Sequence, residues 1–305
     1  MKRSILKLKP HFEYRVWANE NLKTIFNLDQ DKIGEAWLIS ALENKSSIIT
    51  NLDQQQSLLD FYNNPENAAF FNDYNLNNPY PMLAKIIDAK ADLSVQIHPD
   101  DQYAKQFNQL GKTECWYILD TKNNNEIVLG HNAKSLEAFK DAITNQQWDQ
   151  LLKKQSIKKD DFIYVPAKKI HAIKADTLIY ELQQSSDITY RVYDYDRLDN
   201  GQKRELHLDH VFNLIETPDQ DLAPNQISNQ GGYLVANEQF YLKVIDNNGS
   251  NEYQFKDAKW IQLSVIEGTG KINNLDANKF DSFLIAHNTN LIIEGKCKCL
   301  ISFIK

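Results

Sequence analysis

SVQIHPDD at residues 94–101 is the stretch of sequence that decides the fold and points to the chemistry. In an extended strand, alternate side chains lie on the same face, so Gln96 and His98 are predicted to point the same way, with Ser94 beside them. A strand face that carries an amide and an imidazole can hold a metal ion. His98 alone would be explained more simply as a structural histidine, so the interpretation depends on what the rest of the chain supplies.

Two later segments supply complementary metal ligands. GKTECW at 111–116 places Glu114 at the entry to another expected strand, and YVPAKKIHAI at 164–173 places His171 just past a proline-bounded turn. Two imidazoles, one carboxylate and one amide suit zinc, manganese, iron or cobalt better than magnesium. The other histidines are expected to be surface or structural residues: His11, His131, His207, His210 and His287.

Short stretches rich in Val, Ile, Tyr and Phe predict strands along most of the chain. Two longer stretches, 56–71 and 134–154, predict helices, and Ser135 is expected to cap the second. Many short strands with helical insertions favour a jelly roll or barrel over alternating β-α-β units. The predicted strands are 4–10, 33–40, 92–98, 115–120, 126–130, 161–166 and 177–184.

The chain is predicted to divide near residue 215. Residues 196–232 are rich in Asp, Asn, Gln, Gly and Pro, and their segments GQKREL, TPDQDLAPNQ and SNQGG indicate loop or linker. Strand patterns then return, with GTG at 268–270 expected to be a turn between two strands. We therefore expect a catalytic, metal-binding domain with helical insertions at 1–215, and a linker with a second, degenerate β domain at 216–305.

Composition narrows the class of protein. The formal net charge of −7 over 305 residues argues against a general nucleic-acid binder, which needs a basic face. The three cysteines, Cys115, Cys297 and Cys299, do not form a disulfide framework, so a reducing compartment fits. No segment reaches the roughly 20 apolar residues that span a bilayer. We expect a cytoplasmic protein with neither nucleic acid nor membrane as a partner.

The sequence resembles the type I mannose-6-phosphate isomerase family, in particular its shorter bacterial members. This resemblance implies a mainly β fold of tandem cupin jelly rolls with a small helical insertion. It also implies a sugar-phosphate substrate. We expect the C-terminal part to stabilise the fold or to form a homodimer. The resemblance is carried by SVQIHPDD (94–101), GKTECWYILD (111–120), DFIYVPAKKIHAI (161–173) and ELQQSSDITYRVYDYDR (181–197), in the family's order.

The resemblance also implies the metal site. Gln96, His98, Glu114 and His171 match positions that bind Zn2+ in the family, so one Zn2+ per chain is expected, with Mn2+ or Co2+ as alternatives. Some shorter members of the family lack the glutamine and coordinate through the other three residues. A divalent metal with an open coordination position would act as a Lewis acid on the sugar oxygens.

The resemblance also implies catalytic and substrate-binding roles for further residues of this chain. Arg191 matches the catalytic arginine, which would neutralise the enediolate or the phosphate. Lys112 matches a lysine that assists proton transfer or holds the sugar phosphate, and Glu181 is the other candidate for the base. Glu181 and Asp187 match acidic positions lining the pocket. Ser94, Lys112 and Asp187 are expected to bind the substrate.

The implied activity is the interconversion of D-mannose 6-phosphate and D-fructose 6-phosphate by metal-assisted proton transfer through an enediol. Another metal-dependent cupin enzyme and a non-catalytic sugar-phosphate-binding cupin are the alternatives. For Glu114 and Arg191, ion pairs with neighbouring residues are the structural alternative to a functional role. Glu114 could merely pair with Lys112, and Arg191 with Asp194 or Asp196 at the surface.

One departure from the family concerns the turn before His171. The family more often has glycine at the position of Lys168, and a residue with a side chain disfavours positive φ. We therefore expect this turn to differ in shape. The whole chain has only 10 glycines, so asparagine is expected to take over left-handed positions in the loops.

Overall fold

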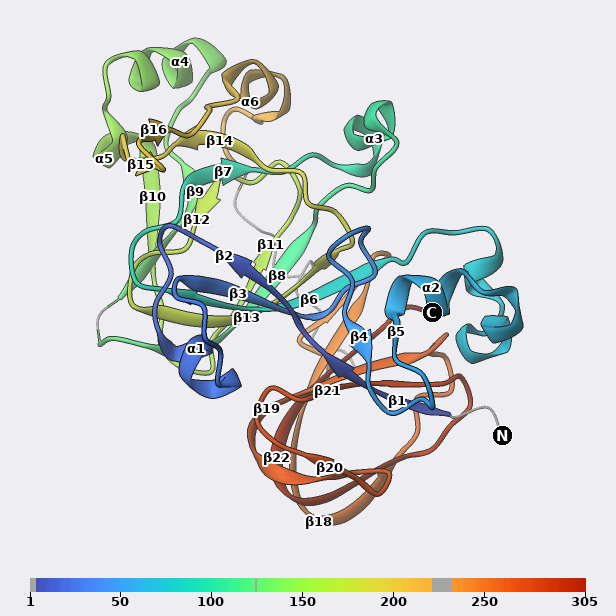
Figure 1. The fold of residues 1–305 in the computed structure, drawn as a ribbon. Helices are drawn as coiled ribbons and strands as arrows, with labels where there is room; N and C mark the ends of the chain where they lie inside the picture. Colours follow the sequence, from blue (N-terminus) through green and yellow to red (C-terminus); the bar gives the residue numbers. More distant parts are fainter. Residues whose placement is uncertain (1–3, 124, 221–231) are drawn as a thin grey trace. The chain divides into compact units, whose positions relative to one another are not determined.

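The computed structural model describes residues 4–123, 125–220 and 232–305 (Figure 1). It separates into two compact units, one of Met1–His11, Trp37–Lys85 and Ala223–Lys305, the other of Phe12–Ala36 and Ile86–Leu222. Antiparallel sheets dominate both units, which confirms the mainly β fold class. The units interleave along the chain, and the domain boundary near residue 215 stays a prediction.

The second unit is built on two sheets. The six-stranded sheet has the strand order β11-β8-β13-β6-β3-β2, and the five-stranded sheet has the order β10-β9-β12-β7-β14. Strands were predicted correctly at β3, β7, β8, β9, β11 and β13. The six-stranded sheet contains β2 (His11–Tyr14), β3 (Ile33–Ile39), β6 (Met82–Ala89), β8 (Glu114–Thr121), β11 (Phe162–Val165) and β13 (Thr177–Gln184). The five-stranded sheet contains β7 (Val95–Ile97), β9 (Glu126–His131), β10 (Leu152–Ser156), β12 (His171–Ala172) and β14 (Tyr190–Tyr193).

Side chains of the five-stranded sheet alternate between two environments. On β7, Val95 and Ile97 belong to a buried cluster with Phe139 of α4 (Leu136–Thr144), Leu151 of α5 (Trp148–Leu151) and Val211 of α6 (Leu208–Leu214). These helices therefore cover one face of the sheet, as Figure 1 also shows. The alternate residues of β7 point to the opposite face.

That opposite face meets the six-stranded sheet. Ile127 of β9 and Ile173 just after β12 pack with Trp116 and Ile163 of the six-stranded sheet in a second buried cluster. The two sheets therefore enclose an apolar interior. The alternation of side chains along β7 directs Gln96 and His98 into this interior. Polar groups in this interior are shielded from water.

Two predicted helices need correction. In 134–154, Ser135 caps α4 as expected by accepting from the N–H of Ala138, but Leu152 begins β10 because residues 152–156 pair with β9. In 56–71, the helix α2 (Leu58–Asn63) ends before Pro65, and the 3₁₀ helix η1 (Pro65–Phe71) follows. The remaining short helices are α1 (Asn21–Phe26), α3 (Asp101–Ala104), η2 (Tyr74–Leu76) and η3 (Lys105–Phe107).

The segment predicted as loop, 196–232, also holds regular structure. It contains α6 and the small hairpin of β15 (Leu198–Asp199) with β16 (Gln202–Lys203). The polar composition of the segment had favoured a loop at these positions. The SNQGG segment at 228–232 lies outside the described residues except for Gly232. In the described ranges, no helix has the length and apolar character to cross a membrane.

The first unit is organised by one sheet of nine strands, in the order β17-β18-β22-β19-β21-β1-β4-β5, with β20 also paired to β19. The N-terminal strand β1 pairs with β21, so the two ends of the sequence share this sheet. Its strands are β1 (Ile5–Lys9), β4 (Ile48–Ile49), β5 (Gln56–Ser57), β17 (Val235–Ala236), β18 (Tyr241–Tyr253), β19 (Ile261–Ile272), β20 (Leu275–Ala277), β21 (Ser282–Ile285) and β22 (Leu291–Phe303).

The GTG segment at 268–270 is not a turn, and that prediction was wrong. It lies inside β19 and pairs with β22, while the turn from β19 to β20 is formed by Asn273 and Asn274, both with positive φ. Glycine is needed at 270 for another reason, which is that a Cβ there would overlap the backbone carbonyl oxygen of Glu294. The two strands thus approach too closely for any side chain.

Left-handed backbone positions confirm the expectation for asparagine and revise the one for Lys168. Asn27, Asn72 and Asn108, like the turn at 273–274, take positive φ. Lys168 also does so, with φ of 67°, which is the conformation that we expected a lysine to avoid. Its backbone N–H donates to the carbonyl oxygen of His98 at 2.8 Å, a bond that offsets the strain and holds the turn before β12.

We predict that Gly270→Ala lowers the free energy of unfolding by about 1–3 kcal/mol, because the added methyl group forces β19 and β22 apart. Thr269→Ala is the matched control, since Thr269 is exposed in the same strand. Chemical denaturation measures both. A Gly270→Ala protein as stable as the control would contradict this account of the close approach.

We predict that Lys168→Gly is more stable than Lys168→Ala by about 1 kcal/mol, because only glycine adopts positive φ without strain. Both variants lose the ion pair from Nζ of Lys168 to Oδ2 of Asp100, at 2.6 Å, so this loss cancels in the comparison. Thermal unfolding of the two variants tests the prediction. Alanine at or above the stability of glycine would show that the turn is not strained.

Candidate metal and active site

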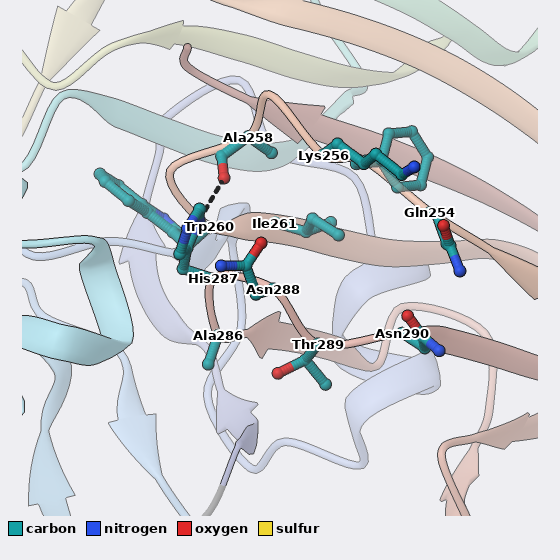
Figure 2. A pocket seen from close by; sticks show the side chains of 11 residues that line it. Gln254, Lys256, Ala258, Trp260, Ile261, Ala286, His287, Asn288, Thr289 and Asn290 are labelled. Carbon is teal, nitrogen blue, oxygen red and sulfur yellow. Dashed lines mark hydrogen bonds between the residues drawn. The ribbon is translucent and has the colours of Figure 1, made fainter.

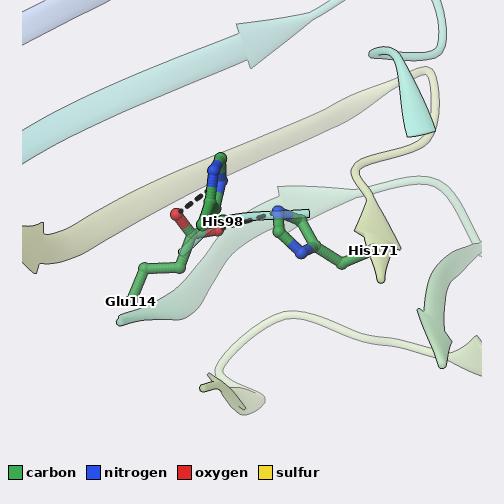
Figure 3. A group of neighbouring side chains, drawn as sticks. All are labelled: His98, Glu114 and His171. Carbon is green, nitrogen blue, oxygen red and sulfur yellow. Dashed lines mark ion pairs between the residues drawn. The ribbon is translucent and has the colours of Figure 1, made fainter. Parts of the chain in front are cut away.

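Three buried side chains predicted as metal ligands come together between the two sheets (Figure 3). Nε2 of His98 lies 3.4 Å from Oε2 of Glu114, and Nε2 of His171 lies 3.3 Å from Oε1 of Glu114. One ligand atom from each residue lies within 4.8 Å of the other two. Across the described part of the chain, no other group of three His, Cys, Asp or Glu residues is arranged in this way.

The orientation of His171 leaves a nitrogen free for coordination. Its Nδ1 lies 2.8 Å from the carbonyl oxygen of Lys169, which can only accept, so Nδ1 carries the proton and Nε2 presents a lone pair. This Nε2 and Oε2 of Glu114 are buried and have no hydrogen-bond partner. Buried polar atoms without a partner are costly. Two nitrogens and a carboxylate oxygen that face one another therefore fit a divalent metal.

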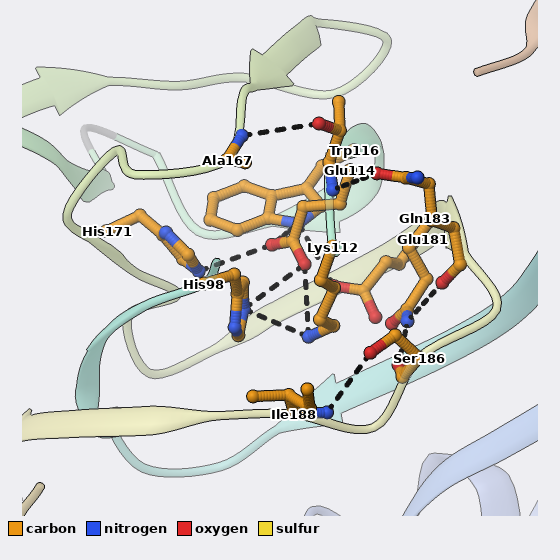
Figure 4. A network of polar contacts seen from close by, with 12 residues as sticks. His98, Lys112, Glu114, Trp116, Ala167, His171, Glu181, Gln183, Ser186 and Ile188 are labelled. Atoms are coloured by element: carbon orange, nitrogen blue, oxygen red, sulfur yellow. Dashed lines mark hydrogen bonds and ion pairs between the residues drawn. The ribbon is translucent and has the colours of Figure 1, made fainter. Parts of the chain in front are cut away.

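Lys112 adds a positive charge to this cluster (Figure 4). Its Nζ lies 2.9 Å from Nε2 of His98 and 3.1 Å from Oε2 of Glu114, and its side chain is buried. The pairing of Glu114 with Lys112 that we considered as a simple alternative therefore exists, but it includes the histidines as well. Lys112 and a metal ion would share the same acceptor atoms.

The charge states follow from burial and from these contacts. Burial opposes ionisation of Glu114, but Lys112, His98 and His171 outweigh it and hold the pKa of Glu114 well below its ordinary value. Burial and the charge of Lys112 lower the pKa of His98 to about 3. The cluster at neutral pH thus consists of one carboxylate and neutral imidazoles, which is the state that coordinates metals.

Trp116 is a site residue that the sequence analysis missed. Its indole Nε1 lies 3.1 Å from Oε1 of Glu114 and 3.2 Å from Oε1 of Glu181, so one N–H serves both carboxylates. The strand register explains this contact, because Glu181 pairs with Trp116, and Gln183 pairs with Glu114. The four side chains therefore share one face of the six-stranded sheet. The i, i+2 spacing of Glu114 and Trp116 was the available signal.

The five-stranded sheet supplies the other half of the site. Gln96 pairs with His171 on one side and with Arg191 on the other, so all three lie on the interior face. Ser94, just before β7, is buried, whereas Asp187 is exposed in the turn after β13. The substrate roles of these two residues stay predictions.

Arg191 does not form the surface ion pair that we considered. Asp194 accepts instead from Nη2 of Arg197 at 2.6 Å and from Nε of Arg204 at 2.7 Å, and Asp196 pairs with Lys203. Within the described ranges, the guanidinium of Arg191 has no hydrogen bond or ion pair, and its Nε is buried. Burial and the charge of Arg204 lower the pKa of Arg191. A half-buried cation without a counter-ion is suited to an anionic ligand.

Another hollow, of about 250 Å³, lies in the first unit (Figure 2). Amide side chains and Trp260 line it, and its titratable groups are Lys256 and His287. Nδ1 of His287 is bound to the carbonyl oxygen of Ala258 at 3.0 Å. This hollow offers neither a carboxylate nor a ligand cluster.

Comparisons with known proteins identify the family of the chain. Residues 5–142 match the family model described as phosphomannose isomerase type I, catalytic domain. This range includes His98, Lys112 and Glu114 but ends before His171 and Arg191. Relatives that align along nearly the whole chain cover the rest.

Two such relatives are Bacillus subtilis proteins. One carries the name "probable mannose-6-phosphate isomerase" and is 38% identical over 97% of this chain and 98% of its own length. The other, a mannose-6-phosphate isomerase, is 35% identical over 97% of this chain and 98% of its own length. A crystal structure of the mannose 6-phosphate isomerase from Bacillus subtilis covers 99% of this chain and 100% of its own, at 35% identity and a TM-score of 0.91. From these matches, and from the cluster of His98, Glu114 and His171, the chain belongs to the type I phosphomannose isomerase family.

Proposed function

We propose that this chain interconverts D-mannose 6-phosphate and D-fructose 6-phosphate by moving a proton between C1 and C2 through an enediol. The observation that carries the proposal is the buried cluster of His98, Glu114 and His171, with Arg191 on the same interior face as His171 and without a counter-ion. Negative charge that develops on the sugar oxygens would be met in this dry interior, where electrostatic interactions are strong.

For the cofactor we propose one Zn2+ per chain, with Mn2+ or Co2+ as alternatives. Nε2 of His98, Nε2 of His171 and a carboxylate oxygen of Glu114 would hold it, and Gln96 is the proposed fourth ligand because it lies beside His171 in the sheet. When bound, such an ion supplies Lewis acidity toward the sugar oxygens. The bond from His171 to the carbonyl of Lys169 supports this role, since ligand histidines usually donate their other nitrogen in this way.

The chain offers two groups for the proton transfer, and we favour Glu181 as the base. A carboxylate is an acceptor, and the indole of Trp116 fixes the position of Oε1 of Glu181. Nζ of Lys112 is hydrogen-bonded to Nε2 of His98 and ion-paired with Glu114, so its positive charge lies at the metal cluster. Lys112 would then contribute positive charge beside the reacting sugar oxygens rather than remove a proton.

Arg191 would stabilise the anion. Its guanidinium keeps its charge at any relevant pH, and the neighbouring Asp194 is occupied by two other arginines. It is therefore available to bind the enediolate or the phosphate. No observation favours the alternatives of another cupin enzyme or a non-catalytic binder. The homodimer and the cytoplasmic location stay predictions, as does the absence of nucleic-acid and membrane partners.

We predict that His98→Ala, Glu114→Ala and His171→Ala each lose bound metal and at least about 100-fold in isomerase activity, because each removes a ligand. His287→Ala is the control, since His287 lies in the other unit. Metal content after purification is measured first. Chelator-treated parent protein is then assayed with zinc, manganese and cobalt added back. Unchanged metal content in all three variants would contradict the ligand assignment.

We predict that Arg191→Gln keeps the fold and the metal but loses about 100- to 1000-fold in kcat/KM, because it removes the charge that meets the anion. Lys203→Gln is the control for loss of a nearby positive charge, since Lys203 is exposed. Exchange of the substrate C2 proton with solvent and steady-state rates measure the effect. Turnover at the parent rate would remove Arg191 from the mechanism.

A further inference from the structure

β14, the strand that carries Arg191, is the last strand of the five-stranded sheet. β7 pairs with it on one side, where Arg191 lies opposite Gln96. An edge strand leaves backbone N–H and C=O groups on its outer side without a ladder partner. Something other than a neighbouring strand must therefore hold the backbone of Arg191 in place.

His207, the residue before α6, supplies that contact through two hydrogen bonds. The N–H of Arg191 donates to Nδ1 of His207 at 3.0 Å, and the N–H of His207 donates to the carbonyl oxygen of Arg191 at 2.9 Å. The pair repeats the exchange of bonds seen between residues of antiparallel strands, with an imidazole nitrogen in place of one carbonyl. The side chain of His207 is thus part of the pairing of β14.

The charge state of His207 is compatible with this contact. Nδ1 can accept a hydrogen bond only when it is unprotonated. Burial and the charge of Arg191 lower the pKa of His207, although Glu205 opposes them. The neutral imidazole, with its proton on Nε2, therefore accepts from Arg191 at neutral pH.

The consequence lies in the guanidinium of Arg191. A long side chain without a hydrogen bond or ion pair in the described structure is oriented by its backbone and by packing. Its reach toward an anion then depends on where the Cα is held, and misplacement by about 1 Å can cost 100-fold in rate. Loss of the contact at Nδ1 would free the edge strand at this residue.

We propose that His207 is a positioning residue for the isomerase reaction, which acts by holding the backbone of Arg191 so that its guanidinium meets the anionic substrate. This inference rests on the proposed role of Arg191. It assigns a task to a histidine that the sequence analysis treated as a surface or structural residue.

The test compares His207→Leu with His207→Asn in the zinc-loaded full-length enzyme. Leucine has no acceptor, whereas Oδ1 of asparagine stands at the same number of bonds from Cα as Nδ1 of histidine. We expect His207→Leu to lose about 10- to 100-fold in kcat/KM, with metal content retained, and His207→Asn to recover most of that loss. The split of the loss between kcat and KM should repeat that of Arg191→Gln.

His210→Leu is the matched control. His210 lies in α6, stacks on Tyr190 and is bonded through Nδ1 to the hydroxyl of Tyr103, and in the described structure it has no hydrogen bond to Arg191. Its replacement shows what a loosened α6 alone does to the rate. A loss equal to that of His207→Leu would overturn the positioning role.

A double-mutant cycle decides whether His207 acts through Arg191. In an Arg191→Gln background, we expect His207→Leu to cost little further activity, because the group that it positions is gone. The same fold-loss in both backgrounds, or a folded His207→Leu enzyme at the parent rate, would overturn the inference. If the Arg191→Gln single variant turns over at the parent rate, the proposed role of Arg191 fails instead. That outcome is seen in the single variant alone, so it is distinguished from a failure of the inference on His207.

If His207→Leu does not fold, His207→Asn and His207→Gln carry the test. Glutamine moves the acceptor one bond further from the backbone, so we expect the glutamine variant to be slower than the asparagine variant. Equal rates for the two would overturn the inference.

Discussion

The buried carboxylate of Glu114 is the constraint on which the rest of the structure depends. A carboxylate that is 0% exposed loses several kcal/mol of hydration, so the fold must surround it with compensating groups. Lys112 and the indole N–H of Trp116 do this. They compensate the charge incompletely, since Oε2 is buried without a hydrogen bond, and a divalent ion would fit this deficit.

The two sheets of the second unit assemble the candidate site around this carboxylate. The register of β8 against β13 places Glu114 and Trp116 beside Glu181 on one interior face. In the five-stranded sheet, β12 and β14 flank β7. This pairing brings His171 and Arg191 to the interior face of that sheet. Helices on the outer face of the five-stranded sheet keep water from that side. Charges inside therefore interact more strongly than they would at the surface.

Local charge, rather than net charge, prepares the site for an anionic substrate. The chain carries a formal charge of −7, yet Lys112 and Arg191 both lie at the interior site. Arg197 and Arg204 engage Asp194, the nearest acidic residue along the chain, which leaves the guanidinium of Arg191 without a counter-ion. The contact from His207 fixes its backbone. A chain of negative net charge can therefore offer an anionic ligand a local positive charge, since Arg191 is left without a counter-ion in the described structure.

The sequence by itself determined the period of each strand and the kinds of group that each strand carries. Alternation in β7 predicted that Gln96 and His98 share a face, because that period is a local property of the backbone. Only the tertiary structure decided which strands meet. Residues 152–156 became a strand because β9 lies beside them, and GTG became the middle of a strand because β22 lies against it. The shared indole bond of Trp116 depends likewise on Glu181, which lies 65 residues away along the chain. Such contacts gain free energy only when the chain has closed on itself, so no short stretch of sequence encodes them.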